Sequence, residues 1–221
     1  MDLSAFQRFS FYPLLYVFGM CTAYRLGKKE VGRLPKGMGA AAGRELGRMG
    51  ERLVRPTISA PVVGMDGELE EMRWGFSRPF SHAVVNARED KLGGQMWREA
   101  MEGRRCLIPA TGYYEWSGPK GEKRTHLFRS AEGRGEWLWI AGIWEEDEKL
   151  GRCFSMITTQ PRGVVCGVHD RMPAVLSPDE TQTFLRGEMK AFLPSETALR
   201  VEDAVNPLTG RKPGPVQDEL F

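Results

Sequence analysis

Cys21 directly follows a methionine, and this pair suggests the first piece of chemistry. If translation starts at Met20 and the methionine is trimmed, Cys21 carries both a free α-amine and a thiol. An α-amine has a reference pKa of about 7.7–8.0, so an appreciable fraction is nucleophilic at physiological pH. Such an amine and thiol form a five-membered ring with an aldehyde, through a Schiff base that the thiolate attacks. The alternative is a small buried residue at the start of a strand.

Glu115 ends an apolar, strand-like stretch over 105–116 that passes a proline and a glycine and contains large aromatics on both sides of the acid. This pattern predicts a poorly hydrated carboxylate. Such a group costs several kcal/mol unless a partner or a task compensates. Glu115 is therefore a candidate for proton transfer. A buried acid that holds a loop through backbone N–H groups is the alternative.

Asn86 and Arg88 lie two residues apart at the end of a predicted strand, so their side chains share one face. Asn86 is suited to hydrogen-bond a substrate oxygen while Arg88 binds a phosphate. Both residues are equally suited to capping a loop.

His169 is followed by Asp170 and Arg171, a setting that suits a proton-transfer residue at a phosphate-bearing site. A structural histidine is the alternative. His82 and His126 lie in strand-edge contexts, and we assign them no role.

Arg73 and Trp74 combine a cation with a large aromatic. If exposed, they form a stacking platform for unpaired bases. Packing in the core is the competing interpretation, and we prefer it for Trp137, Trp139 and Trp144.

The 221 residues suffice for one sizeable core, and 41% hydrophobic and 27% charged residues are typical of a globular protein. A net charge of +2 does not indicate a non-specific polyanion binder. The four cysteines form no CxxC pair, which argues against a zinc ribbon or a disulfide scaffold and favours a reducing compartment. Cys166 and His169 lack a second ligand pair. We expect a cytoplasmic monomer without metal or cofactor.

Residues 1–19 differ from the rest of the chain. The segment is apolar, but it is too short to span a membrane and Pro13 interrupts it. It has no clean signal-peptide cleavage site. We interpret it as an upstream extension produced by a mis-assigned start or removed later, with Met20 as the initiator. A genuine N-terminal extension is the alternative.

From Met20 the pattern predicts one β-rich domain over 20–205. Expected strands lie at 21–26, 61–63, 68–76, 83–87, 126–129, 136–144 and 153–159. Expected helices lie at 40–53, 95–102 and 178–186. The proline-containing tail, 206–221, is expected to extend over the surface.

Taken together, these motifs resemble those of the SRAP family of abasic-site processing proteins, also called SOS response-associated peptidases. They occur in family order from Met20 to Pro173. The matching pieces are Met20-Cys21, Arg73-Trp74-Gly75, Asn86-Ala87-Arg88, Pro109-Ala110-x-Gly112-Tyr113-Tyr114-Glu115-Trp116, Ile157-Thr158-Thr159 and His169-Asp170-Arg171-Met172-Pro173.

The resemblance implies a single α+β domain in which a twisted, β-barrel-like mixed sheet is flanked by helices and carries a positively charged groove for single-stranded DNA. It implies that Cys21 bonds the ring-opened sugar aldehyde of an abasic site. Asn86 and Glu115 would hold the amine and assist ring opening, and His169 would be the acid/base. The implied DNA contacts are Arg73, Trp74, Arg88, Thr158 and Arg171.

Two departures from the family pattern stand out. Thr22-Ala23-Tyr24 follows the cysteine in place of a Gly-Arg-Phe-like run. The segment after Gly75 lacks the usual Pro-x-Trp and has Phe76, Pro79 and Phe80 instead. The sequence therefore matches the family least in the base-stacking wedge, the segment whose side chains are expected to stack on DNA bases.

Three functions are compatible with these residues. The first is a DNA-repair enzyme that crosslinks itself to abasic sites in single-stranded DNA, with associated lyase activity. The second is a cysteine hydrolase or autopeptidase that uses Cys21, His169 and Asn86. The third is a DNA-binding module without chemistry. It applies if the extension over 1–19 is retained, since a blocked Cys21 amine cannot form the ring.

Overall fold

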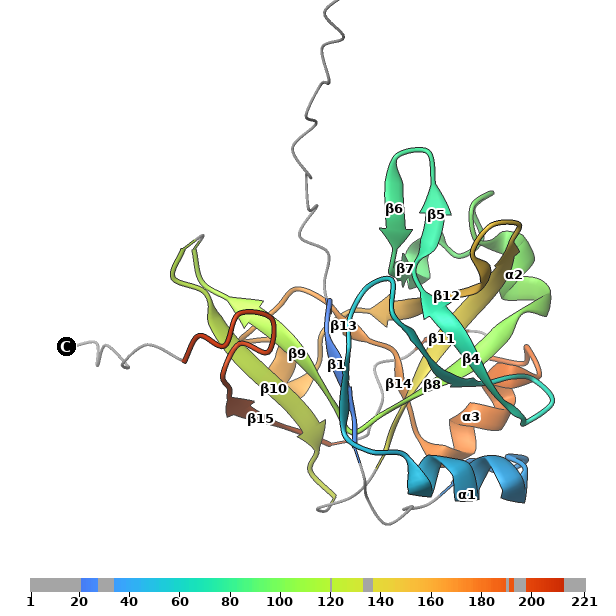
Figure 1. Ribbon diagram of the computed structural model, residues 1–221, viewed down its shortest axis with the longest axis horizontal. Coiled ribbons are helices and arrows are strands. Elements are labelled where there is room, and N and C mark those ends of the chain that lie inside the picture. Colours follow the sequence, from blue (N-terminus) through green and yellow to red (C-terminus); the bar gives the residue numbers. More distant parts are fainter. Residues whose placement is uncertain are drawn as a thin grey trace, which may run out of the picture.

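The computed structural model describes residues 21–27, 34–119, 121–132, 137–189, 191–192 and 198–212. Figure 1 shows a barrel-like body with a second sheet at its side. The expected extension over 1–19, Met20 and the end of the tail from 213 onward lie outside the described residues.

Five strands close into a barrel, because each pairs with two neighbours in the order β4-β3-β8-β11-β12 and back to β4. The contact between β12 and β4 is parallel and the others in this ring are antiparallel, so the sheet is mixed. Their bounds are Ser59–Val63 (β3), Leu69–Trp74 (β4), Arg105–Ala110 (β8), Leu138–Asp147 (β11) and Gly151–Thr159 (β12).

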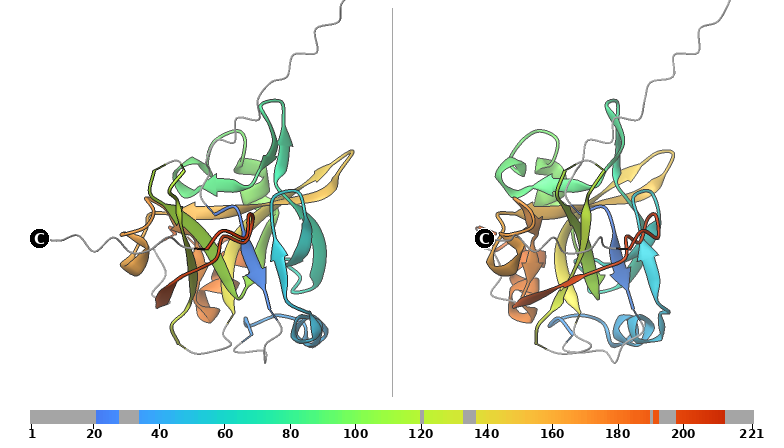
Figure 2. Two further views of the ribbon diagram at one scale, coloured as in Figure 1. Left: turned by 60° about the vertical axis from the view of Figure 1, so that its left-hand side comes forward. Right: turned by 90° about the vertical axis from the view of Figure 1, so that its left-hand side faces the viewer.

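Three short strands extend this sheet. β7 runs parallel to β12, whereas β13 and β14 pair antiparallel with β12 and β11. They span Asn86–Arg88 (β7), Met172–Pro173 (β13) and Val175–Leu176 (β14). A separate hairpin is formed by Phe76–Arg78 (β5) and Ser81–Val84 (β6), and it stands out from the body in Figures 1 and 2.

The second sheet has the order β15-β10-β9-β1-β2 and is antiparallel throughout. Its strands are Tyr24–Leu26 (β1), Arg52–Val54 (β2), Gly112–Ser117 (β9), Arg124–Ser130 (β10) and Leu199–Asp203 (β15). Because β8 of the barrel leads into β9 across a single residue, Thr111, the two sheets are joined at this point.

Helices flank the sheets: Ala40–Arg48 (α1), Arg98–Gly103 (α2) and Pro178–Leu185 (α3), with 3-10 turns at Glu89–Lys91 and Gly163–Val165. Helix α3 begins with a capping box, in which Ser177 and Glu180 satisfy each other's backbone N–H groups. Arg105 donates to Met101 O near the end of α2 and to Leu185 O at the end of α3, which ties both helices to the barrel.

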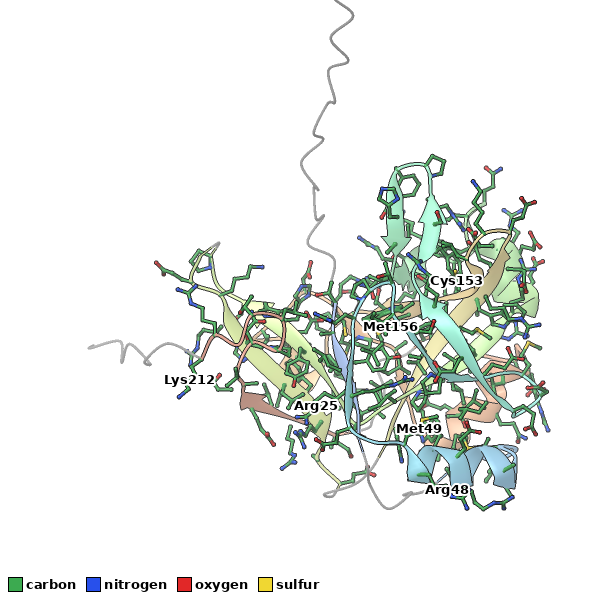
Figure 3. All side chains as sticks on the ribbon, in the orientation of Figure 1. Arg25, Arg48, Met49, Cys153, Met156 and Lys212 are labelled. Carbon is green, nitrogen blue, oxygen red and sulfur yellow. The ribbon has the colours of Figure 1, made fainter. Side chains whose placement is uncertain are left out.

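Apolar side chains fill the interior of the barrel, Met156 among them (Figure 3). The described helices are all too short and too polar to cross a membrane. In the described part of the chain, no group of His, Cys, Asp and Glu side chains is arranged to hold a metal ion.

The predicted fold class is confirmed, although several boundaries were wrong. The helix expected over 40–53 ends at Arg48, because two glycines weaken it and Leu53 pairs with Arg25 in the second sheet. The strand expected over 68–76 breaks at Gly75, which has a φ of 111° and leaves no room for a Cβ beside Ala83.

Strand β15 was not expected from the sequence. After it, the described part of the expected tail folds back on itself, with residues 208–212 exposed. Asn206 N–H donates to Arg211 O at 2.8 Å and Gly210 N–H donates to Asn206 O at 2.7 Å, so this segment is a tight loop.

Candidate functional site

Cys21 and Glu115 meet at the start of β1. The Cys21 backbone N–H donates to Glu115 Oε1 at 2.8 Å. The register of β1 against β9 brings them together, since Tyr24 lies opposite Tyr113 and Tyr114 N–H donates to Ala23 O. Cys21 is fully buried and Glu115 is 1% exposed. The two residues that the sequence singled out for amine chemistry and proton transfer are therefore hydrogen-bonded neighbours.

The backbone of Cys21 is strained. Its φ of 35° lies in the left-handed region, which L-residues other than glycine, asparagine and aspartate rarely adopt. Such a conformation costs about 1–3 kcal/mol and persists only where the surrounding structure imposes it. Here the hydrogen bond to Glu115 and the pairing of β1 impose it.

Burial dominates the electrostatics of this pair. Loss of water raises the pKa of Glu115 to about 8, and the hydrogen bond from Cys21 N–H acts against this rise. Burial, and then the charge of Glu115, raise the pKa of the Cys21 thiol well above its usual range. Both shifts favour the uncharged forms, a protonated carboxyl group and a neutral thiol.

His169 lies at the edge of this region. Its Nδ1 lies 2.8 Å from Asp170 Oδ1 and 3.2 Å from the Arg171 backbone nitrogen. Nδ1 accepts from Arg171 N–H when it is unprotonated and donates to Asp170 when it is protonated, so in either case Nε2 is the nitrogen left for proton exchange with a ligand. Asp170 carries a negative charge that acts on Glu115, so the His169 loop and the Glu115 strand lie within electrostatic range of each other.

Asn86, Arg88 and Thr158 lie on adjacent parallel strands. Asn86 pairs with Met156 and Arg88 with Thr158, through β7 and β12. Arg88 is exposed and makes a two-pronged contact with Asp90, with both distances at 3.0 Å. Thr158 is fully buried, and its hydroxyl has no hydrogen-bond partner among the described residues.

Arg171 is buried, in contrast to Arg88. It is 6% exposed, and its guanidinium donates to Thr158 O at 2.6 Å. It also lies 4.0 Å from Glu89 and from Asp90. Its Nε has no hydrogen-bond partner among the described residues, so Arg171 keeps one buried donor and its role as a phosphate contact stays a prediction.

The expectation that Trp74 forms an exposed stacking platform is wrong. Its indole is fully buried, stacks on Phe154 and donates to Val85 O at 3.1 Å. Arg73 donates to Gly75 O and to His82 O, and thereby holds the base of the β5–β6 hairpin. The exposed aromatic of this region is Phe80, which is 70% exposed at the hairpin tip.

Sequence reasoning missed a polar cluster beside Glu115. His126 lies directly opposite Glu115 across the β9–β10 pair, and its Nε2 is 2.7 Å from Ser117 Oγ. On its other side, Nδ1 is 3.6 Å from Asp203 on β15. Opposed residues of an antiparallel pair share a face, so this cluster borders the Glu115 side chain. Only the strand register, which the sequence does not reveal, assembles it.

The family model described as SOS response associated peptidase (SRAP) matches residues 20–207. The chain belongs to the SRAP family. The match includes Cys21, Glu115 and His169.

Curated relatives of this SRAP chain carry names that describe an activity. The chain is 28% identical over 135 residues to abasic site processing protein YoqW of Bacillus subtilis, and the match covers 55% of this chain and 59% of that protein. It is 26% identical over 136 residues to abasic site processing protein YedK of Escherichia coli, covering 59% of this chain and 60% of that protein. The chain thus spans about three fifths of the length of these relatives.

Solved structures share the fold. A protein from Bacteroides thetaiotaomicron superposes with a TM-score of 0.66 at 20% identity, over 87% of this chain and 96% of that one. A phage-related protein from Bordetella bronchiseptica gives a TM-score of 0.62 at 22% identity, over 85% and 97%.

Proposed function

We propose that this protein processes abasic sites in single-stranded DNA, and that Cys21, once it is the first residue, forms a covalent thiazolidine with the sugar aldehyde. The observation that carries the proposal is the contact between Cys21 N and Glu115 Oε1, in a site closed to bulk water. The names of the SRAP relatives support the choice of substrate.

The reaction balances without a cofactor. The Cys21 amine adds to C1′ of the ring-opened sugar, and one water leaves as the C=N bond forms. The Cys21 sulfur then adds to the same carbon, and the thiol proton ends on the ring nitrogen. The net change is one aldehyde plus one N-terminal cysteine giving one thiazolidine and one water.

Glu115 is suited to the proton transfers in this sequence. Burial raises its pKa to about 8 while Cys21 N is still a backbone amide. A carboxyl group whose pKa lies near the operating pH can both donate and accept a proton, which is the condition for efficient general acid–base catalysis. A neutral Glu115 can donate to the sugar oxygen as the ring opens, and the carboxylate can accept from the incoming amine.

The strain at Cys21 favours removal of the residues ahead of it. The torsion φ is defined by the carbonyl carbon of the preceding residue, so it no longer exists once Cys21 is first. The cost of about 1–3 kcal/mol for the left-handed conformation is then released.

Lyase activity follows from the same intermediate. Before the sulfur adds, the C1′ imine makes the neighbouring C2′ proton acidic, and loss of that proton eliminates the 3′ phosphate. Ring closure by Cys21 removes the imine, so the two outcomes compete for one intermediate.

The contacts at Cys21 favour ring formation over the hydrolase alternative. A cysteine hydrolase needs a histidine that lowers the thiol pKa. Instead, burial and Glu115 raise the pKa of Cys21, and the described contacts of the His169 ring are with Asp170 and Arg171. Autoproteolysis ahead of Cys21 is a separate step, and a time course of N-terminal masses for purified 1–221 protein tests it.

The decisive experiment uses protein that begins at Cys21 and a single-stranded oligonucleotide with one abasic site. We expect a covalent adduct that survives denaturing electrophoresis. Cys21→Ser should lose the stable product, since an oxazolidine is a weaker sink than a thiazolidine. Cys166→Ser, which removes the exposed cysteine, is the matched control and should react like the parent. Undiminished adduct from Cys21→Ser, or from protein that mass spectrometry shows to retain residues 1–20, contradicts the proposal.

A further inference from the structure

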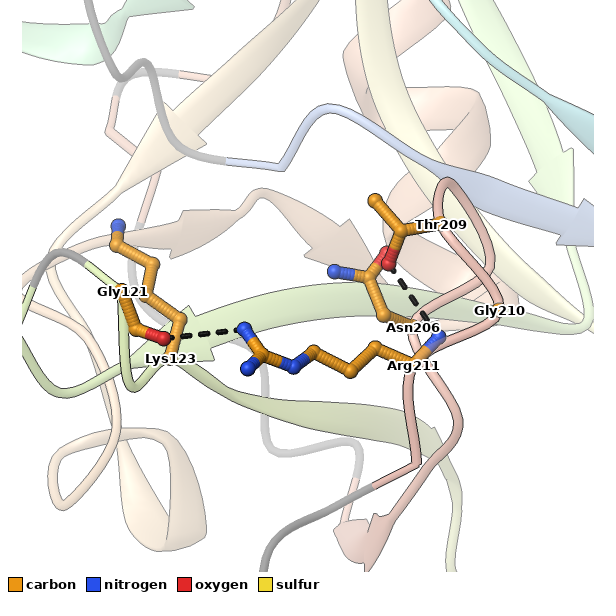
Figure 4. A pocket seen from close by; sticks show the side chains of 6 residues that line it. All are labelled: Gly121, Lys123, Asn206, Thr209, Gly210 and Arg211. Carbon is orange, nitrogen blue, oxygen red and sulfur yellow. Dashed lines mark hydrogen bonds between the residues drawn. The ribbon is translucent and has the colours of Figure 1, made fainter.

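A cavity of about 540 Å³ lies between the turn of the β9–β10 hairpin and the loop after β15 (Figure 4). Neither the sequence motifs nor the proposed chemistry uses it. Its lining consists of Gly121, Lys123, Asn206, Thr209, Gly210 and Arg211.

Hydrogen bonds hold both walls of the cavity in place. Asn206 closes its loop through the backbone bonds to Gly210 and Arg211, and Arg211 N–H donates to Thr209 Oγ1 at 3.3 Å. Arg211 Nη1 reaches across and donates to Gly121 O at 3.1 Å, as the dashed line in Figure 4 shows. A guanidinium has five N–H donors, so Arg211 bridges the walls and keeps donors for a ligand.

The lining of the cavity carries two cationic side chains. These are Lys123 and Arg211, and the six lining residues include no carboxylate. The nearby Arg124 is 2.9 Å from Asp203 and forms an ion pair with it. A second cavity, between the β5–β6 and β11–β12 hairpins, differs in charge. Its lining contains four carboxylates together with cations: Glu145, Glu146, Asp147 and Glu148.

The cavity flanks the reaction centre. Although burial is what raises the pKa of Glu115, Lys123 is among the charges that act on this carboxyl group, in the opposite direction. Glu115 in turn holds Cys21 N. In the second sheet β10, which begins next to Lys123, pairs with β9, and β9 pairs with β1, which begins close to Cys21. A nucleic-acid strand with its reacting sugar at Cys21 would therefore run close to this side of the sheet.

We propose that this cavity is a phosphate subsite, in which Lys123 and Arg211 bind a backbone phosphate of the nucleic-acid strand next to the reacting nucleotide. Thr209 and Asn206 add uncharged donors to the same wall. The volume suits a phosphate that remains attached to the sugars on either side. This inference rests on the proposed function, because it assumes that the strand lies across Cys21 and Glu115.

The test measures binding of an undamaged single-stranded oligonucleotide by fluorescence anisotropy over a range of salt concentrations. Lys123→Ala and Arg211→Ala should each weaken binding and reduce the slope of log K against log salt by about 0.7, since one phosphate contact fewer releases fewer counterions. Arg211→Lys should keep the parent slope, because it preserves the charge.

Two controls separate a local contact from a general loss of positive charge. Arg48→Ala removes an exposed cation from α1, which lies away from Lys212 and the C-terminal loop in Figure 3. Lys149→Ala removes one from the acidic second cavity. Both should leave the slope unchanged. The subsite is wrong if the control variants lose as much salt slope as Lys123→Ala and Arg211→Ala, or if those two variants keep the parent slope. It is also wrong if Arg211→Lys reduces the slope as much as Arg211→Ala does.

Adduct formation by the parent protein tests the proposed function separately from the phosphate subsite. If the parent forms no adduct with abasic DNA, the proposed function fails. If it forms the adduct but Lys123→Ala and Arg211→Ala bind with the parent salt slope, only the phosphate subsite fails.

Discussion

The Cys21 backbone nitrogen and Glu115 Oε1 are 2.8 Å apart, although 94 residues separate them in the chain. Because the pairing of β1 with β9 brings the two residues together, the proposed nucleophile is positioned by sheet register. A group held in this way loses little conformational freedom in the reaction, which is the basis of catalysis by orientation.

Glu115→Gln should change how stability depends on pH. The folded pKa of Glu115 is about 8, raised by burial from an ordinary value of 4.5. Between these values the folded protein binds a proton that the unfolded chain has released, so the stability of the parent falls as pH rises from about 4.5 to about 8. Glutamine cannot ionise, so the variant should gain stability relative to the parent across this window. Denaturant unfolding at several pH values measures the difference.

The form of the N-terminus provides a check on that result. In protein that begins at Cys21, the ammonium group next to Glu115 favours the carboxylate, so the pH dependence should be smaller than in protein that retains the preceding residues. A constant difference between Glu115→Gln and parent from pH 4 to pH 9 would show that Glu115 ionises normally in the folded state.

Glu115 also shows how far the sequence alone could lead. Aromatic and apolar neighbours along 105–116 correctly indicated a buried carboxylate, because an apolar strand packs into the interior and takes its acid with it. Its contact with Cys21 came only through the family resemblance. The Ser117, His126 and Asp203 cluster was missed because it depends on the register of three strands, which local patterns do not encode.

Phe80→Ala and Trp74→Ala should have opposite effects. Phe80 is 70% exposed at the tip of the β5–β6 hairpin, so its removal should leave stability unchanged and weaken single-stranded DNA binding by about 1–3 kcal/mol if a base stacks on it. Trp74 is fully buried, so its truncation should destabilise the fold by roughly 3–5 kcal/mol. Anisotropy and thermal unfolding measure the two effects, and Phe80→Trp should retain binding. If Phe80→Ala binds DNA with the parent affinity, Phe80 is not the residue on which a base stacks.

Trp74 was misplaced for a physical reason. A tryptophan beside an arginine at a strand end is compatible with either face of the sheet, and a slip of one residue exchanges the faces. Here Gly75, with its φ of 111°, redirects the chain into the hairpin and leaves Trp74 inside the barrel.

Arg88 and Asp90 should affect DNA binding in opposite directions. We expect the exposed Arg88 to contact a backbone phosphate, so Arg88→Ala should reduce the salt slope by about 0.7, independently of base sequence. Asp90 would compete with that phosphate for the same guanidinium, because it already makes a two-pronged contact with it. Asp90→Asn should therefore tighten binding. If the slope is unchanged in Arg88→Ala with an intact fold, the arginine is structural and its partner is Asp90 alone.

The last prediction separates Glu115 from His169. An abasic sugar is mostly a closed hemiacetal, so one proton transfer must open the ring before the amine adds, and another must accompany the loss of water. Glu115 lies 2.8 Å from the Cys21 nitrogen, which becomes the amine once the preceding residues are removed, whereas His169 keeps Nε2 available at the edge of the site. Glu115→Gln and His169→Ala should each slow adduct formation by about 10²–10⁴, the usual range for a general acid–base group, without abolishing DNA binding. A substrate fixed as an open-chain aldehyde should restore the rate of the variant that fails at ring opening, and we expect that variant to be Glu115→Gln. Rescue of His169→Ala instead would exchange the two roles, and parent rates in both variants would make Glu115 a structural buried acid.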